Sequence, residues 1–438
     1  MFMEYNEEPK RHSDEELGNE PEIDDSERFS FLQEKIKDKP INKRRVMGKL
    51  LGIAVCGIIL GVFTSVGFAM ARPWAERVFH RGPDPVTIQP EEDEYNEYDE
   101  PEPPPEEEVP QVVDLDIYSY RQLNRALNSV ANEASRSVVE VMGIQGDENW
   151  IRENFGQASS VAGVIFADNG QDLLILTSSR ILRDAENLYI TFADGQSYEG
   201  ALHRRDENLG IAIIRVPKES ISEATWNQID VIETGNSNAV AQGDTIIALG
   251  NPFGYYSGRI FGTVSSTRNS VTIADGEYAL LATDITGNSQ GTGILVSISG
   301  QLVGLIHQEV LEGESRNQIN GLAISRLTGR LTLLLNGDSV PYIGIEGVDV
   351  TEDISREQNM PRGVYVKGIE PGSPAMDAGI RNGDIITEVN GVEITSLSTY
   401  SSTLKDIPVG TQITVIVQRG GAEGYVEVSI SLVVGRRE

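Results

Sequence analysis

The chain has 438 residues and a formal net charge of −31 at pH 7. That length allows two or three domains, and the strongly acidic balance argues against nucleic acid as a partner and against anionic lipid surfaces. A single cysteine, Cys56, excludes an intrachain disulfide, which leaves the compartment open. We expect no cofactor and no metal site.

The first part of the chain predicts a tail followed by a membrane anchor. Residues 1–49 begin with a Glu-, Asp-, Ser- and Pro-rich stretch that cannot bury a core, and they end in a basic one. Residues 50–71 carry no charge and, at about 1.5 Å per residue, can cross a hydrocarbon core of roughly 30 Å. The segment is too long and begins too late for a cleaved signal peptide.

The charges around this segment predict its orientation. Basic residues crowd the N-terminal flank, so residues 1–49 are expected in the cytoplasm and the C-terminal domains outside a cell membrane crossed once. Residues 72–114 follow as an acidic, Pro- and Glu-rich tether, extended by self-repulsion and polyproline preference.

Residues 115–336 have a globular composition and predict a mostly β domain. Tyr120–Ser137 is expected to be a short helix, and β-rich runs separated by Gly and Asp-Gly turns follow it. Short strands at this spacing are typical of a barrel or sandwich. The predicted strands are Ser137–Met142, Ser160–Ala167, Leu173–Thr177, Leu188–Phe192, Gly210–Val216, Thr245–Leu249, Gly258–Ser266 and Ala279–Ala282.

The stretch Thr283–Leu305, TDITGNSQGTGILVSISGQLVGL, organises this domain. A Thr-Asp pair enters a glycine-rich turn and a strand, breaks at Ser299-Gly300 and returns as a second strand. It resembles the nucleophile loop of the HtrA/Deg family of PDZ-containing serine proteases, where the pattern runs TD…GNSGGPLVN…G.VVGI. Ala248–Gly254, ALGNPFG, is similar to that family's A.GNPFG segment. The resemblance implies a trypsin-like double β-barrel.

The same resemblance places other residues where the family has its catalytic triad. Arg180, in LILTSSRIL, stands at the histidine position, and Gly210, in DENLGIAIIRV, stands at the aspartate position. Aligning back from the second strand puts Gly291 at the serine position, whereas aligning on the local GNS triplet puts Ser289 there. A guanidinium stays protonated and cannot act as a base, and glycine supplies neither carboxylate nor hydroxyl.

Two questions about replacement residues stay open at this point. Arg180 is either an exposed arginine at a strand end or a cation filling the old cleft, paired with Asp284 or a ligand carboxylate. His203 and His307 occupy no motif position, so both are expected to be ordinary strand or loop histidines.

Residues 338–438 form a separate unit that resembles a PDZ domain. The resemblance rests on Gly372–Ala375 (GSPA), Gly383–Ile386 (GDII) and Val389–Gly391 (VNG). It implies that the opening residues Tyr342, Ile343, Gly344 and Ile345 form a carboxylate-binding loop with an adjacent strand edge for an extended peptide. The alternative is a PDZ fold used only to pack against the neighbouring domain.

The sequence thus favours an HtrA-like pseudoprotease that binds unfolded or C-terminal peptide segments in envelope protein quality control or signalling. One alternative is an active serine endopeptidase that uses Ser289 with an unrecognised base. A second is a structural scaffold. The expected partners are peptides at the PDZ domain and the membrane at residues 50–71, and since HtrA-family proteins are often trimers, a homo-oligomer stays open.

Overall fold

The computed structural model describes residues 116–144, 160–183, 185–254, 257–311, 317–422 and 424–437, together with Ile88. The predicted tail and anchor, and all of the tether except Ile88, lie outside this part of the chain. Among the residues described, no helix has both the length and the apolar character needed to cross a membrane. The anchor at 50–71 therefore stays a prediction.

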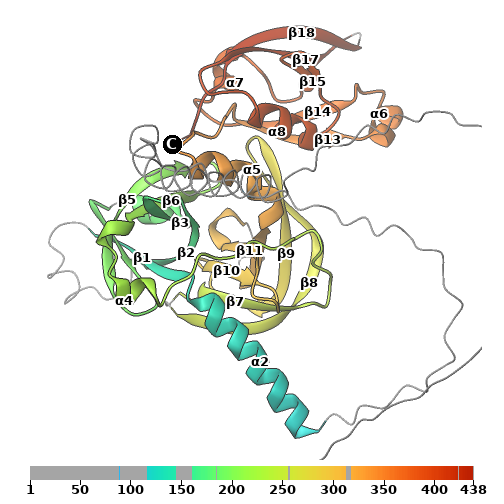
Figure 1. Cartoon of the computed structure of the whole chain (residues 1–438). Coiled ribbons are helices and arrows are strands. Elements are labelled where there is room, and N and C mark those ends of the chain that lie inside the picture. Colours follow the sequence, from blue (N-terminus) through green and yellow to red (C-terminus); the bar gives the residue numbers. More distant parts are fainter. Residues whose placement is uncertain are drawn as a thin grey trace, which may run out of the picture. The chain divides into compact units, whose positions relative to one another are not determined.

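The first six strands close into an antiparallel barrel (Figure 1). Its walls are built from β-branched and leucine-rich runs, so every residue of β2 before Asp168 is buried. Val139, Ile175 and Ile214 lie in one of its hydrophobic clusters. In the order β1-β2-β3-β6-β5-β4, the strands are β1 (Val138–Ile144), β2 (Ser160–Asp168), β3 (Asp172–Ser178), β6 (Ile211–Pro217), β5 (Ser197–Asp206) and β4 (Asn187–Thr191).

The next six strands close into a second antiparallel barrel. All of β10 is buried, and it pairs with β11 on one side and β7 on the other. In the order β10-β11-β12-β9-β8-β7, the strands are β10 (Thr292–Val296), β11 (Leu302–His307), β12 (Gln318–Ala323), β9 (Gly276–Thr286), β8 (Gly258–Ile273) and β7 (Thr245–Asn251).

Two helices flank the barrels. The first, α2 (Ile117–Ser135), is capped by Asp116 and buries only Ala131 and Ala134 near its C-terminal end. Figure 1 shows the rest of α2 extending away from the barrels. The second, α5 (Ile324–Leu335), follows β12 directly and buries Leu327, Leu331 and Leu334 at helical spacing. Short turns η1 (Ser179–Leu182), η2 (Lys218–Ser220), α4 (Glu223–Trp226) and η3 (Gln308–Val310) complete this region.

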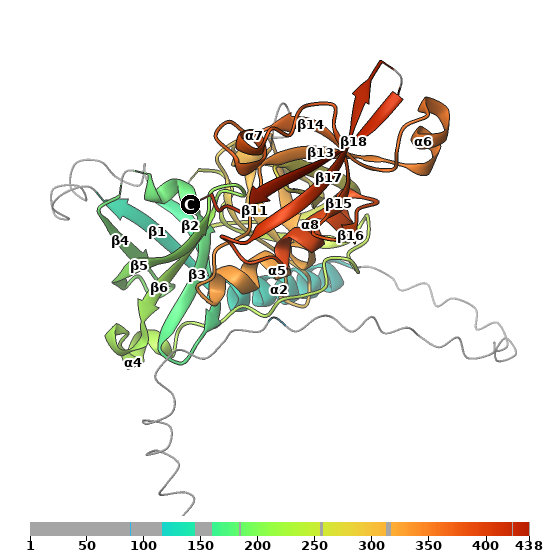
Figure 2. The same ribbon diagram turned by 90° about the horizontal axis from the view of Figure 1, so that it is seen from above.

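The last hundred residues form an antiparallel sheet of their own, with β13 at one edge. Figure 2 shows its strands together with α7 and α8. Tyr400 on α8 is fully buried in its core, together with Ile386 and Val415. The elements are β13 (Ile345–Val350), α6 (Glu352–Gln358), β14 (Gly363–Ile369), α7 (Pro374–Ala378), β15 (Ile385–Val389), β16 (Val392–Glu393), α8 (Leu397–Lys405), β17 (Gln412–Gly421) and β18 (Gly424–Val433).

The mostly β architecture of two barrels followed by a PDZ unit is confirmed, while several boundaries differ. The β8–β9 hairpin is longer than predicted, because β8 runs to Ile273 and β9 begins at Gly276. The helix α5 was not predicted from the sequence, because Gly329 and two threonines interrupt its helix formers. Packing of its leucines against the barrels outweighs that weak propensity.

Candidate functional site

Arg180, at the position of the family's histidine, lies in η1 directly after β3. Its guanidinium contacts the Glu309 carboxylate at 2.7 Å, with side chains 22% and 25% exposed. Asp284 instead accepts hydrogen bonds from the backbone N–H and hydroxyl of Thr263. Arg180 is therefore half-buried rather than exposed, and its partner is Glu309 rather than Asp284.

Gly210, at the position of the family's aspartate, faces His307. A Cβ at Gly210 would lie 2.6 Å from the His307 Nε2 atom, and the glycine has φ = +71°. His307 is 3% exposed, and burial lowers its pKa to about 4. The imidazole is therefore neutral near pH 7 and occupies the space that a triad carboxylate would need, a role for which the sequence contains no motif.

Gly291 directly precedes β10 and lies beside the same segment. The Gln308 N–H donates to the Gly291 carbonyl at 3.2 Å, and a Cβ at Gly291 would lie 3.4 Å from Gln308 Cγ. That Cβ would also lie 3.0 Å from the carbonyl oxygens of Asn288 and Pro252. Gly291 thus contacts the segment 307–309, while the choice between Gly291 and Ser289 at the serine position stays a prediction.

Ser289, the alternative nucleophile, is exposed on the turn that ends at Gly291. The turn is closed by the Gly291 N–H, which donates to the Asn288 carbonyl at 2.8 Å. Within the described ranges, no hydrogen bond joins Ser289 to a histidine, although a general base must lie within about 2.6–3.2 Å of its proton source. His203 is engaged elsewhere, with its Nε2 3.1 Å from the Leu335 carbonyl oxygen.

The three triad-equivalent positions therefore meet around one tripeptide. His307 lies against Gly210, Gln308 bonds Gly291 and Glu309 pairs with Arg180. None of these pairs combines a nucleophile with a base that could accept its proton.

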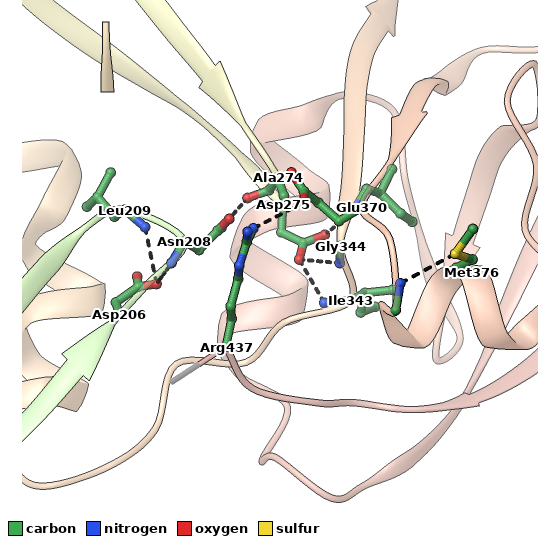
Figure 3. Close-up of polar contacts among 12 residues, drawn as sticks. Asp206, Asn208, Leu209, Ala274, Asp275, Ile343, Gly344, Glu370, Met376 and Arg437 are labelled. Atoms are coloured by element: carbon green, nitrogen blue, oxygen red, sulfur yellow. Dashed lines mark hydrogen bonds and ion pairs between the residues drawn. The ribbon is translucent and has the colours of Figure 1, made fainter. Parts of the chain in front are cut away.

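The PDZ loop shows the opposite situation, because its donors are in place and engaged. The N–H groups of Ile343 and Gly344 both donate to Asp275 Oδ2 at 2.7 Å (Figure 3). The Ile345 N–H donates to Oδ1 of the same carboxylate at 3.1 Å. The Tyr400 hydroxyl donates to Oδ1 at 2.6 Å. The Tyr342 N–H instead donates to the Gly435 carbonyl, so the loop has three converging amides.

Gly344 allows this convergence. It has φ = +91°, and a Cβ there would collide with the Ser373 side chain and lie 2.8 Å from the Tyr342 hydroxyl. A residue with a side chain would therefore be strained and crowded at this position.

Asp275 reaches the loop from the tip of the β8–β9 hairpin. Ala274 and Asp275 form its two-residue turn, with Asp275 at φ = +59°. The Asn208 side-chain amide donates to the Ala274 carbonyl at 2.6 Å (Figure 3). Asp275 is fully buried, and burial raises its carboxyl pKa while the Tyr400 hydroxyl and three loop amides oppose the rise. Its Asp-Gly dipeptide signals a hairpin, but no local pattern signals its distant partners.

A buried ion pair lies between these two regions. Arg330 on α5 contacts Asp206 at 2.8 Å, and its guanidinium lies 5.4 Å from the centre of the Tyr278 ring on β9. Asp206 also accepts hydrogen bonds from the backbone N–H groups of Asn208 and Leu209, just before Gly210. The pair therefore joins the turn at Gly210 to the hairpin that carries Asp275.

Family models match both regions. Residues 161–305 match the trypsin-like peptidase domain, and residues 365–419 match the PDZ domain. Together with the paired barrels and the trailing PDZ sheet, these matches decide the family. The chain belongs to the HtrA/Deg family.

HtrA relatives are similar over 61% to 70% of the chain. The periplasmic serine endoprotease DegP of Escherichia coli (strain K12) is 28% identical over 280 residues, which cover 61% of this chain and 56% of DegP. The serine protease Do-like HtrA of Lactococcus lactis subsp. lactis (strain IL1403) is 25% identical over 349 residues, 70% of this chain and 83% of that protein. The chain spans little more than half the length of the DegP protein.

Solved HtrA structures share the fold. The HtrA-type protease AlgW with a tripeptide has a TM-score of 0.51 at 20% identity, covering 71% of this chain and 97% of that one. AlgW with a decapeptide has a TM-score of 0.50 at 19% identity, covering 71% and 99%.

Proposed function

We propose that this HtrA-family protein is a peptide-binding pseudoprotease whose ligands end in a free carboxylate and bind at the PDZ loop. The observation that carries the proposal is the convergence of the Ile343, Gly344 and Ile345 N–H groups on one carboxylate. Charge-assisted hydrogen bonds of this kind are about twice as strong as neutral ones. The AlgW structures, which contain a tripeptide or a decapeptide, support the same class of ligand.

The absence of proteolysis is the second half of the proposal. Its support is the set of residues at the triad-equivalent positions, Arg180, Gly210 and Gly291, and the exposure of Ser289 without a histidine partner in the described structure. Relatives such as DegP are named serine endoproteases, so this chain would have kept their framework and lost their chemistry.

The proposal also covers where the protein is located and whether it self-associates. The uncharged segment 50–71 and its basic flank support a single-pass protein of the cell membrane, with its C-terminal domains outside and a role in envelope protein quality control or signalling. Apolar residues exposed on α2, including Ile117, Tyr118 and Leu123, support self-association.

The test is a binding titration with the full-length chain in mild detergent. The probe is a fluorescein-labelled hexapeptide pool ending in valine, prepared both as the free acid and as the C-terminal amide. Tighter binding of the acid supports the proposal, and equal binding of both forms contradicts the carboxylate site. In parallel, cleavage of unfolded casein that disappears in Ser289→Ala would establish the peptidase alternative.

A structural scaffold is the second candidate, and one observation favours it. The loop amides are already bonded to Asp275 of the barrel region, as expected if the PDZ fold serves for packing. Binding of neither peptide form, by the full-length chain or by any variant at Asp275, would support this candidate.

A further inference from the structure

Asp275 presents two groups to the PDZ unit, and both are groups that a peptide terminus would offer. Its carboxylate accepts the N–H groups of Ile343, Gly344 and Ile345. Its own N–H donates to the Ile345 carbonyl at 2.8 Å. The last residue of a peptide likewise carries a carboxylate together with one N–H, so the same three loop residues could satisfy it in the same way.

The contact satisfies the ionised form of Asp275. Its two carboxylate oxygens accept four hydrogen bonds, three of them from backbone N–H groups, which cannot act as acceptors. The carboxylate is fully buried, so these donors replace the water that it loses. A second carboxylate brought to this loop would have no free amide to accept from.

We propose that Asp275 is an internal ligand of the PDZ loop, and that a peptide with a free C-terminus binds only by displacing it. The inference rests on the proposed function and names how that site is regulated. The ligand class is a peptide that supplies its own terminal carboxylate and N–H to Ile343–Ile345 and extends along β13. Asp275 imitates only the terminal residue, and β13 is an edge strand of its sheet, so the longer ligand gains main-chain bonds that Asp275 lacks.

Apart from the contacts that Asp275 makes with the PDZ unit, the hairpin tip is bonded by a side chain from the β5–β6 turn. Asn208 bonds the adjacent Ala274 carbonyl, and Asp275 itself occupies the left-handed region that residues other than glycine rarely adopt. Displacement of Asp275 requires the tip to lose these contacts while the β8–β9 ladder, which starts at the Ile273–Gly276 pair, stays formed.

The expected size of the effect follows from competition. The minor state of a two-state equilibrium is commonly populated at about 0.1–10%. The apparent Kd of a ligand rises in inverse proportion to the competent fraction. Removing Asp275 should therefore tighten the binding of free-acid peptides by about tenfold or more.

The experiment compares wild type with Asp275→Gly, Asp275→Asn and Glu277→Gln, all as full-length chains. Glycine and asparagine both tolerate positive φ, so either substitution suits the turn. Glu277→Gln is the matched control, because it removes one negative charge from the same hairpin at an exposed side chain bonded to Ser270. The probe is the valine-ended hexapeptide pool, as acid and as amide.

Free-acid peptides should bind Asp275→Gly about tenfold more tightly or better, with a smaller gain in Asp275→Asn and none in Glu277→Gln. The amide should bind all four proteins alike. Binding by Asp275→Gly where wild type binds nothing also supports the inference, and it means that the resting chain is closed to ligands. Unchanged or weaker acid binding in both Asp275 variants, with binding in wild type, would overturn the inference while leaving peptide binding intact.

A second readout decides the case in which no protein binds either peptide, so that the proposed function fails. Hydrogen exchange is followed in the segment containing Ile343–Ile345, with sodium acetate compared with sodium chloride at equal concentration. Acetate should protect this segment in Asp275→Gly and leave wild type unchanged. If acetate protects the segment in neither protein, Asp275 is a fixed clip between packed elements and the inference is wrong.

Discussion

The triad-equivalent region and the PDZ loop have both been closed to their expected chemistry, in different ways. Around His307–Glu309 the positions Arg180, Gly210 and Gly291 carry no histidine, aspartate or serine, and three neighbouring residues fill their space or bond them. At Ile343–Ile345 every donor is present, and one carboxylate occupies them all. Closure by substitution requires several coordinated changes to reverse, whereas closure by an internal ligand is reversible by one mutation or by a competing ligand.

The largest free-energy deficit should be the one that prevents catalysis in the triad-equivalent region. Arg180→His combined with Gly210→Asp should leave casein hydrolysis undetectable, since loss of a triad typically lowers turnover on the order of 10⁶-fold. The new aspartate would collide with His307 Nε2 at a position of positive φ, and Gly291 still lacks a hydroxyl. Turnover by this double variant that requires Ser289 would show that the region keeps more chemistry than its contacts indicate.

The next largest effect should be the loss of stability on removal of the Arg330–Asp206 ion pair, which joins the two regions. Arg330→Leu leaves the Asp206 carboxylate buried without its cation, which should lower the free energy of unfolding by about 3–5 kcal/mol in denaturant titration. Arg356→Leu is the matched control, because its partner Glu352 is exposed and such pairs contribute about 0.3–0.5 kcal/mol. If Arg330→Leu lowers the free energy of unfolding as little as Arg356→Leu does, the Arg330–Asp206 ion pair does not stabilise the fold.

The pH dependence of stability should report the lowered pKa of His307, the buried histidine beside Gly210. The unfolded chain binds a proton at His307 below about pH 6.5, whereas the native chain resists it until about pH 4. Stability should therefore fall as pH drops through this window, by about 3 kcal/mol in total. His307→Gln should flatten the profile of unfolding free energy against pH, and His203→Gln, at a half-buried site, should flatten it less. Parallel profiles for wild type and His307→Gln would mean that the pKa of His307 is the same in the native and unfolded chains.

The smallest effect should come from weakening the hold on the hairpin tip that places Asp275 in the PDZ loop. Asn208→Ala removes the hydrogen bond to Ala274 without touching the PDZ loop. One neutral hydrogen bond contributes about 1 kcal/mol, so free-acid peptides should bind roughly fivefold more tightly. Asn128→Ala, on the exposed face of α2, should leave the affinity unchanged. If Asn208→Ala raises the affinity for acid and amide peptides equally, the hairpin tip does not control access to the carboxylate-binding amides.

The sequence alone determined the architecture, and it placed Arg180 and Gly210 where the resemblance puts the family's histidine and aspartate. The two barrels and the PDZ unit could be predicted from apolar strand patterns, Gly and Asp-Gly turns and family motifs. Such signals are local and repeat along the chain. The helix α5 escaped prediction, since tertiary packing of its leucines outweighs a weak local propensity.

Only the tertiary structure decided what replaced the triad and what occupies the PDZ loop. Glu309 lies 129 positions from Arg180, and Ile343 lies 68 from Asp275. No periodicity or spacing links residues so far apart, and a carboxylate in the sequence does not reveal which donors it will meet. Those partners are set by the closure of the second barrel and the reach of the β8–β9 hairpin, where burial requires each charge to find a donor or a counter-charge.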